Sequence, residues 1–477
     1  CNKSILKQLM NSIVQPVVVK FIVFLYFINL PAVTYAQAGE KQSGKSSKRA
    51  KEREVVQAKG IDSYFDSGFL RYEDFIYRES VRTVLFHREG WELTPPMILF
   101  NSDEKLMLSF DDLDADYKVW QYTVIHCDAV WKPTDLWQNE YIEGFTEDYI
   151  RDYKYSYNTL QAFTHYKLTI PNDNFRFTLP GNYILKIYPE GMPDQPAITR
   201  RFMVVDPKVT VKARVKRSSV IDQYFTHQEV PFSVLNPAYP IPEPYRDLKV
   251  VILQNNRWDN AIWNLAPMML RADELDYQYT DGRNSFEAGN EFRYFDIKSL
   301  RYTSERVRQV ENRNDGYHVT LLPDAARTFK PYVTYSDING QRLIKTEDAR
   351  DNDLEAEYVW VDFFIPWDAP MTDGAPYIMG ALTDWQFSAA GNTPGERSGP
   401  GRMSYNFARQ GYEARLYLKQ GYYNYLYAFL PNGESEAELA RLEGSRYETR
   451  NSYTILVYYR EQGSRFDRLI AAEVVEN

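Results

Sequence analysis

The sequence contains few cysteines and histidines, the residues that bind zinc and that many enzymes use as nucleophiles or bases. Its 477 residues include two cysteines, Cys1 and Cys127, and five histidines. Two cysteines cannot form a disulfide framework, and the histidines do not have the short spacings of a zinc site. The sequence also lacks a Gly-x-Ser-x-Gly elbow and a recognisable Ser-x-x-Lys set. We therefore predict no catalytic residue, no bound metal and no cofactor.

An excess of basic residues is also missing. The 56 lysines and arginines are outnumbered by 65 aspartates and glutamates, which gives a formal net charge of −9. No basic stripe offsets this charge, and nucleic-acid binding is therefore not expected. A chain of this length is too long for one hydrophobic core and suggests about two to four domains.

The long apolar run of a comfortable membrane span is absent as well. Val17–Leu30 is apolar but short, and the small-x-small sequence Ala36-Gln37-Ala38 follows it. We predict a signal peptide over residues 1–38, with an uncleaved membrane anchor as the alternative. Residues 39–75 should form a flexible leader, because their charged first part cannot bury a core. The sequence Gly39-x-x-x-x-Gly44-Lys45-Ser46 matches a phosphate loop only formally, since the strand and helix that should flank it are not expected.

Aromatic residues, by contrast, are abundant. The chain has 38 tyrosines and 26 phenylalanines, together with 25 prolines and 23 glycines, a composition that favours β-sandwiches over helical bundles. We predict an all-β fold of three tandem immunoglobulin-like β-sandwich domains after the signal peptide. The predicted domains span residues 76–207, 208–350 and 351–477.

Leu106–Phe110 and Tyr117–Asp128 alternate apolar and polar side chains, which is the period of half-buried strands. The acidic segment Asp111–Asp116 between them is too short for a crossover helix, and this predicts a hairpin. The acidic segment lacks the glycine and the distal glutamate of a calcium loop. We interpret its carboxylates as turn residues that satisfy their own backbone.

A loop crowded with aromatic residues follows, from Trp131 to Tyr157. Exposed tyrosine and tryptophan side chains are frequent anchors of protein–protein interfaces. We therefore predict partner-binding roles for four rings in this loop. The alternative, that these rings fill the sandwich core, stays open because β-proteins use aromatic residues heavily. The four predicted residues are Trp131, Trp137, Tyr141 and Phe145.

The last quarter of the chain resembles starch- and glycogen-binding sandwich modules. The resemblance rests on Gly380-Ala381-Leu382-Thr383-Asp384-Trp385 and on Gly421-Tyr422-Tyr423-Asn424-Tyr425-Leu426-Tyr427. It implies that Trp385 and Tyr423 stack on a sugar face. Leu426 departs from the pattern, because those modules carry a lysine at its position. Glycan binding is therefore the alternative function.

Several blocks, in order along the chain, resemble the plug protein family of the Bacteroidota type IX secretion system. The resemblance covers nearly everything after about residue 76. It implies a non-enzymatic periplasmic subunit, peripheral to the outer membrane, that docks on the large translocon barrel and plugs its periplasmic opening. It implies no small-molecule substrate, and no catalytic residue carries over from the family. The blocks include Leu108–Asp116, Tyr122–Asp128, Glu140–Phe145, Thr164–Leu168, Gly181–Tyr183, Thr199–Val204 and Gly289–Asp296.

Overall fold

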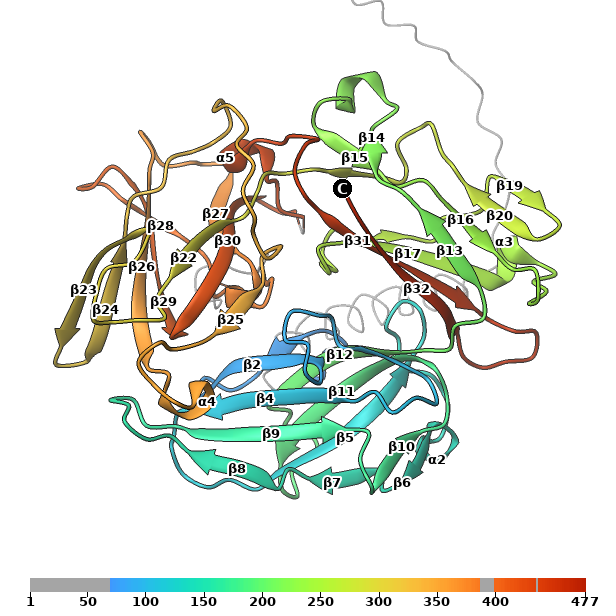
Figure 1. Ribbon diagram of the computed structural model, residues 1–477, viewed down its shortest axis with the longest axis horizontal. Coiled ribbons are helices and arrows are strands. Elements are labelled where there is room, and N and C mark those ends of the chain that lie inside the picture. Colours follow the sequence, from blue (N-terminus) through green and yellow to red (C-terminus); the bar gives the residue numbers. More distant parts are fainter. Residues whose placement is uncertain (1–68, 387–398, 435) are drawn as a thin grey trace, which may run out of the picture. The chain divides into compact units, whose positions relative to one another are not determined.

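The computed structural model describes residues 69–386, 399–434 and 436–477 (Figure 1). They fall within the compact unit Asp66–Asn477, whereas the predicted signal peptide and most of the predicted leader lie outside the described residues. Within the described part, no helix is long and apolar enough to cross a membrane. Strands dominate, and the predicted all-β fold is confirmed. The α-helices within the described residues have four residues each: α2 (Gln138–Tyr141), α3 (Pro244–Asp247), α4 (Asn352–Glu355) and α5 (Ala440–Glu443).

The first domain is a sandwich of two main sheets around one hydrophobic core. Phe110, Trp120 and Tyr166 meet in that core, where the Phe110 and Tyr166 rings stack with centroids 5.1 Å apart. One sheet has the order β1 (Phe75–Ile76), β12 (Ile198–Val205), β11 (Gly181–Pro189), β5 (Trp120–Cys127) and β7 (Glu147–Tyr149), with β3 (Met97–Leu99) beside β12. The other has the order β2 (Val81–Arg88), β4 (Leu106–Asp112), β9 (Thr164–Ile170) and β8 (Asp152–Tyr155), and β6 (Ile142–Gly144) pairs separately with β10 (Phe175–Phe177).

The two strands predicted as a hairpin form, but they do not pair with each other. Strand β4 lies between β2 and β9, whereas β5 lies between β11 and β7 in the other sheet. The acidic segment therefore crosses from one layer of the sandwich to the other. This crossing lets both strands face one core, and the rings of Phe110 and Trp120 meet there edge-on at 5.9 Å.

A second hydrophobic core lies between two further sheets. One sheet has the order β13 (Thr210–Ala213), β16 (Phe232–Leu235), β20 (Glu274–Tyr277) and β19 (Met269–Arg271). The facing sheet has the order β18 (Ile262–Trp263), β17 (Leu248–Gln254), β31 (Ser452–Tyr459) and β32 (Arg468–Glu476). A smaller sheet consists of β14 (Lys216–Arg217), β15 (His227–Glu229) and β21 (Ser285–Glu287).

The third core is enclosed by two further sheets. One sheet has the order β23 (Val307–Arg313), β24 (Gly316–Leu321), β26 (Tyr358–Pro366), β29 (Gly411–Lys419) and β28 (Ser404–Asn406). The other is built on β30 (Gly421–Pro431), which pairs with β22 (Arg293–Asp296), β25 (Arg342–Ile344) and β27 (Gly374–Met379).

Strand pairing crosses the predicted boundary at residue 350 four times, because β24 pairs with β26 and β25 pairs with β30 in addition to the two pairs described next. The C-terminal strand β31 pairs with β17 from Leu248↔Tyr459 to Gln254↔Tyr453, and Figure 1 shows the red strands β31 and β32 beside the green β17. Strand β22, which precedes the boundary, pairs with β30, which follows it. The sheets therefore do not follow the segments 208–350 and 351–477. Local periodicity identifies a strand, but it does not identify the strand that will lie beside it.

Candidate interaction surfaces and buried charge clusters

The four predicted partner-binding rings divide into two exposed and two buried side chains. Trp137 is 77% exposed and Phe145 62% exposed, whereas Trp131 and Tyr141 are buried. Trp131 packs edge-on against Trp258 with ring centroids 5.0 Å apart. A buried ring cannot contact a partner, so Trp131 and Tyr141 are core residues and the predicted binding role is wrong for them.

Short-range geometry explains why Trp137 and Tyr141 point to different environments. Trp137 precedes α2 in an extended conformation, and its backbone N–H donates to the carboxylate of Glu140 at 2.7 Å. Tyr141 ends the helix inside the first core, where its ring lies 6.0 Å from that of Tyr183. Trp137 is thus held at the surface by a local cap while Tyr141 completes the core.

Exposed aromatic rings continue along the chain after Trp137. Six exposed rings fall between residues 137 and 157, and we call this set the aromatic rim. Strand β8, which carries two of them, is an edge strand of its sheet. Figure 1 shows α2, β6, β7 and β8 along the same edge of the first domain. The rim consists of Trp137, Phe145, Tyr149, Tyr153, Tyr155 and Tyr157.

The rim rings on β8 contact one another and a neighbouring tyrosine. Tyr153 lies 4.6 Å from the ring of Tyr117 and 5.9 Å from that of Tyr155. These contacts hold the rings in place while leaving part of each exposed. The four predicted rings did not include Tyr149, Tyr153, Tyr155 or Tyr157 of the same loop. The Tyr-x-Tyr spacing of Tyr153 and Tyr155 is a usable signal, because it places both rings on one side of a strand.

A polar groove of about 250 Å³ lies beside the rim, between β7 and the end of β9. Asp148 in its wall accepts hydrogen bonds from Arg151 at 2.5 Å and from Asn174 at 3.2 Å. Burial alone would raise the pKa of Asp148, but the hydrogen bonds from Arg151, the Tyr149 backbone and Asn174 together outweigh it, and the pKa is lowered. The carboxylate is therefore held ionised and paired.

A buried charge cluster joins the first domain to the third core. The Lys419 ammonium on β29 lies 2.6 Å from Oδ2 of Asp111 on β4. Tyr358 on β26 donates to the same oxygen at 2.7 Å, and Nδ1 of His165 on β9 lies 2.6 Å from Oδ1. Burial would raise the pKa of Asp111, but Lys419 and His165 lower it. Asp111 is thus a paired core residue and not the turn residue that the sequence analysis predicted.

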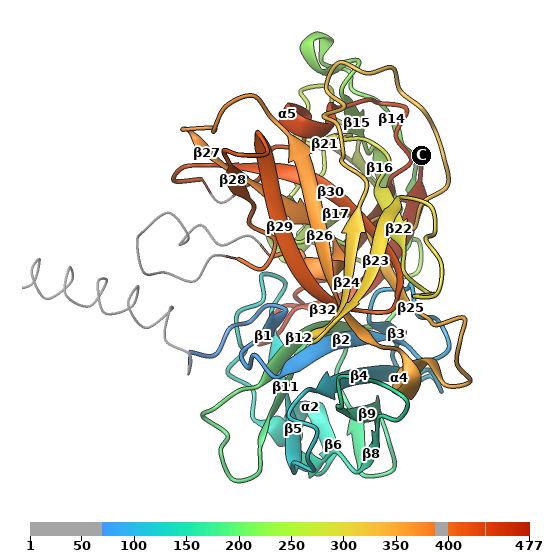
Figure 2. The same cartoon turned by 90° about the vertical axis from the view of Figure 1, so that its left-hand side faces the viewer.

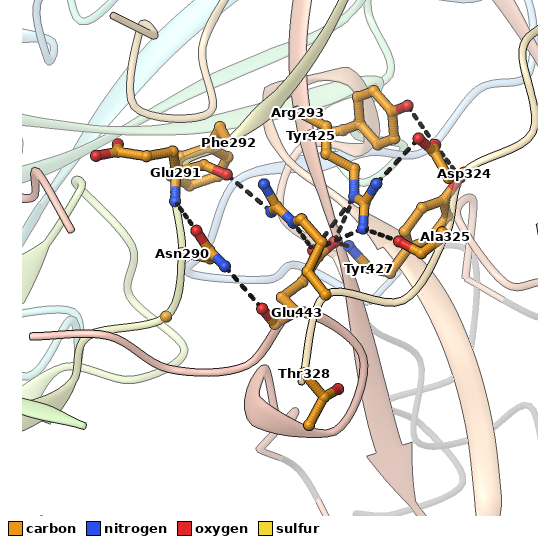
Figure 3. Close-up of polar contacts among 12 residues, drawn as sticks. Asn290, Glu291, Phe292, Arg293, Asp324, Ala325, Thr328, Tyr425, Tyr427 and Glu443 are labelled. Carbon is orange, nitrogen blue, oxygen red and sulfur yellow. Dashed lines mark hydrogen bonds and ion pairs between the residues drawn. The ribbon is translucent and has the colours of Figure 1, made fainter. Parts of the chain in front are cut away.

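A second cluster is centred on Glu443 of α5 and is shown in Figure 3. Arg293 approaches the Glu443 carboxylate at 2.9 Å and Arg327 approaches it at 2.6 Å. Arg293 also bonds Asp324 at 3.0 Å. Burial would raise the pKa of Glu443, but the two guanidinium groups lower it to about 2. The cluster contains the Asn290–Arg293 part of a block that carried the family resemblance.

Neither cluster offers a site for a substrate within the described residues. Asp111, Lys419 and Glu443 are all buried. The cavity that reaches His165 has a volume of about 20 Å³, which is room for a single water molecule. In the described part of the chain, no group of three histidine, cysteine, aspartate or glutamate side chains is arranged to hold a metal ion.

The two rings predicted to stack on a sugar do not form an exposed platform. Tyr423 is buried and stacks on Phe295 at 5.1 Å inside the third core. Trp385 is partly buried and packs edge-on against Phe292 at 6.0 Å. The predicted sugar contact is therefore wrong for Tyr423, because this ring lies on the face of β30 that packs into the third core.

Comparison with known proteins identifies relatives of this fold. The family model for the first domain of the type 9 secretion system plug protein matches residues 81–206. The crystal structure of a hypothetical protein from Parabacteroides merdae is 34% identical, covers 86% of this chain and 100% of its own, and superposes with a TM-score of 0.81. The chain belongs to the type 9 secretion system plug protein family.

Other comparisons add nothing to this family assignment. An alkylpurine DNA glycosylase from Pseudomonas fluorescens is 12% identical over 26% of this chain and 30% of its own. Its TM-score of 0.15 is too low to indicate a shared fold. A search of curated proteins finds no match. The matched plug domain, residues 81–206, is the part of the chain that carries the aromatic rim.

Proposed function

We propose that this plug-family protein works without catalysis, by docking its first domain on the outer-membrane translocon of the type 9 secretion system and closing the periplasmic opening. It is then a periplasmic protein, peripheral to the outer membrane, and its partner is the large translocon barrel. The observation that carries the proposal is the aromatic rim, because six exposed rings lie in the domain that the family model matches.

The rim has the physical properties of a docking surface. Aromatic side chains bury a large area on binding and lose little rotamer freedom, so they dominate the energetics of many interfaces. The β8 edge adds backbone groups, and the polar groove beside it adds Arg151, Lys167 and Asn172. An apolar set of rings beside polar groups matches the core and margin of a typical interface.

A protein that closes an opening must also hold its domains in a fixed arrangement. Besides the Asp111–Lys419 pair, Tyr458 on β31 donates to the side-chain oxygen of Asn182 at 2.9 Å, which ties the first domain to the second core. Asp467 accepts from the backbone of Ala129 at 2.9 Å, again between these parts. These buried contacts hold the first domain against the strands that follow it, as occlusion of an opening requires.

Affinity purification from native membranes tests the proposal. The double variant Trp137→Ala/Phe145→Ala should recover at least about tenfold less of the large barrel partner, since one interface hot spot contributes about 2 kcal/mol or more. Thermal unfolding should not change, because both rings are exposed. Phe407→Ala is the matched control, since Phe407 is an exposed ring outside residues 81–206. Undiminished recovery of the barrel by the double variant would contradict the proposed docking face.

A further inference from the structure

Two loops outside the first domain expose apolar side chains at their tips, and a third loop adjoins them. Ile221 is 88% exposed and Phe329 97% exposed, and Phe225 and Val333 are exposed as well. The loops span residues 218–226, 327–333 and 446–450. We call them the tip loops.

Hydrogen bonds show that the tip loops adjoin one another. The backbone N–H of Tyr447 donates to the carbonyl of Phe225 at 3.1 Å. Arg446 donates to the carbonyl of Lys330 at 3.3 Å, and the Tyr332 hydroxyl donates to the carbonyl of Glu448 at 3.0 Å. Figures 1 and 2 agree in placing β14 and β15, which flank the first loop, near α5, which precedes the third.

The residues just before Phe329 are anchored by hydrogen bonds to the Glu443 cluster. Arg327, two residues before it, bonds the Glu443 carboxylate and donates to the carbonyl of Glu291 at 2.8 Å. The hydroxyl of Thr328 donates to the carbonyl of Arg441 at 2.8 Å, and Figure 3 shows Thr328 at the base of this cluster. The phenylalanine is therefore presented to solvent by a well-bonded loop.

The charge around the apolar tips is opposite in sign to that of the whole chain. Besides Arg327, which is paired with Glu443, four cations lie on or beside the tip loops, and one of them, Arg217, stacks over the ring of Tyr447 at 3.4 Å. Two exposed carboxylates, Asp222 and Glu448, lie among them. The formal net charge of the chain is −9, so a locally positive surface is unusual for it. The four cations are Arg217, Lys330, Arg446 and Arg450.

We propose that the tip loops form a second docking surface, whose occupant is an anionic phospholipid membrane. Apolar side chains at the tips enter the interfacial layer of the bilayer, and the surrounding cations contact lipid phosphates. Apolar tips with a basic surround match this layer, because its outer part is anionic and its inner part is hydrocarbon. The surface is separate from the aromatic rim and does not rest on the proposed docking to the translocon.

Vesicle co-sedimentation of the full chain tests the proposal. The protein should partition at least about tenfold more strongly into phosphatidylcholine vesicles that contain about one third phosphatidylglycerol than into pure phosphatidylcholine. This expectation follows because each net cation near an anionic bilayer should raise the partition coefficient by about fivefold. Salt at about 0.5 M should remove most of this preference.

Two double variants separate the apolar contribution from the charge contribution. Phe225→Asp/Phe329→Asp should lower partitioning by about tenfold or more, and Lys330→Glu/Arg450→Glu should abolish the preference for anionic vesicles.

Phe407→Asp is the matched control, because it places the same charge at an exposed ring outside the tip loops. Every variant keeps the apolar run Val17–Leu30, so its contribution cancels in the comparison. Unchanged thermal unfolding verifies that each variant is folded.

The proposal is overturned if the native chain does not prefer anionic vesicles, or if Phe225→Asp/Phe329→Asp binds them as Phe407→Asp does. Loss of the barrel partner without any effect on vesicle binding would assign the tip loops to a protein interface and would also overturn it.

Discussion

Removal of one partner of the Asp111–Lys419 pair should be among the most destabilising single substitutions in this protein. Substitution of Lys419 by methionine keeps most of the side-chain volume but leaves the Asp111 carboxylate buried and without its cation. Lys419 and Asp111 are both 1% exposed at their side chains, and the ammonium and carboxylate lie 2.6 Å apart. Removal of one partner from such a pair costs about 3–5 kcal/mol, because the remaining charge is desolvated and uncompensated.

Arg415 on the same strand provides a matched comparison. Its guanidinium pairs with Asp362 at 2.6 Å, but the Arg415 side chain is 48% exposed. Water and salt screen this pair, and Arg415→Met should therefore cost no more than about 1 kcal/mol. The two substitutions remove the same charge from one strand, so their difference isolates the effect of burial.

Urea unfolding near neutral pH, followed by tryptophan fluorescence, measures both variants. Lys419→Met should lower the free energy of unfolding by several times as much as Arg415→Met. The double variant Asp111→Leu/Lys419→Met should recover much of the loss, because an apolar pair leaves no unpaired charge. Equal costs for Lys419→Met and Arg415→Met, or no recovery in the double variant, would refute this reasoning.

Two further predictions concern the C-terminal half of the chain. Because the pKa of Glu443 is lowered to about 2, this carboxylate contributes about 3 kcal/mol at neutral pH that is lost as the pH falls from about 5 toward 2. Urea unfolding of Glu443→Gln should accordingly depend less on pH across that window, and an unchanged dependence would contradict the assignment. Gly340→Ala should cost at least about 2 kcal/mol, because Gly340 has a φ of +76° and an added Cβ would overlap the Trp385 ring. Gly433→Ala, at a φ of +85° in open space, should cost only about 1 kcal/mol in the same unfolding experiment, and equal costs would exclude the overlap.

Strand positions could be predicted more reliably than their partners. The expected strands at Leu106–Phe110 and Tyr117–Asp128 correspond closely to β4 and β5. The expected hairpin between β4 and β5 does not exist, and no local pattern indicates that β17 pairs with β31 about two hundred residues later. Alternation of side chains depends on which face of a strand is buried, whereas pairing depends on how the whole chain packs.

Burial of loop residues was equally hard to predict. Trp131, Trp137, Tyr141 and Phe145 occur in one irregular loop, where no periodicity separates inward from outward positions. Only the packing of this loop against Trp258 and the first core decides that two of the rings are buried. Asp111 shows the same limit, because the lysine that neutralises it lies 308 residues away in sequence.

The sequence by itself determined the all-β class and the family, because both depend on local composition and on ordered blocks of residues that can be read along one chain. The tertiary structure decided which rings face solvent, which carboxylates are paired in the core and which strands share a sheet. Those properties depend on contacts between residues hundreds of positions apart. The free energy of such contacts comes from burial and charge pairing that exist only once the chain has folded.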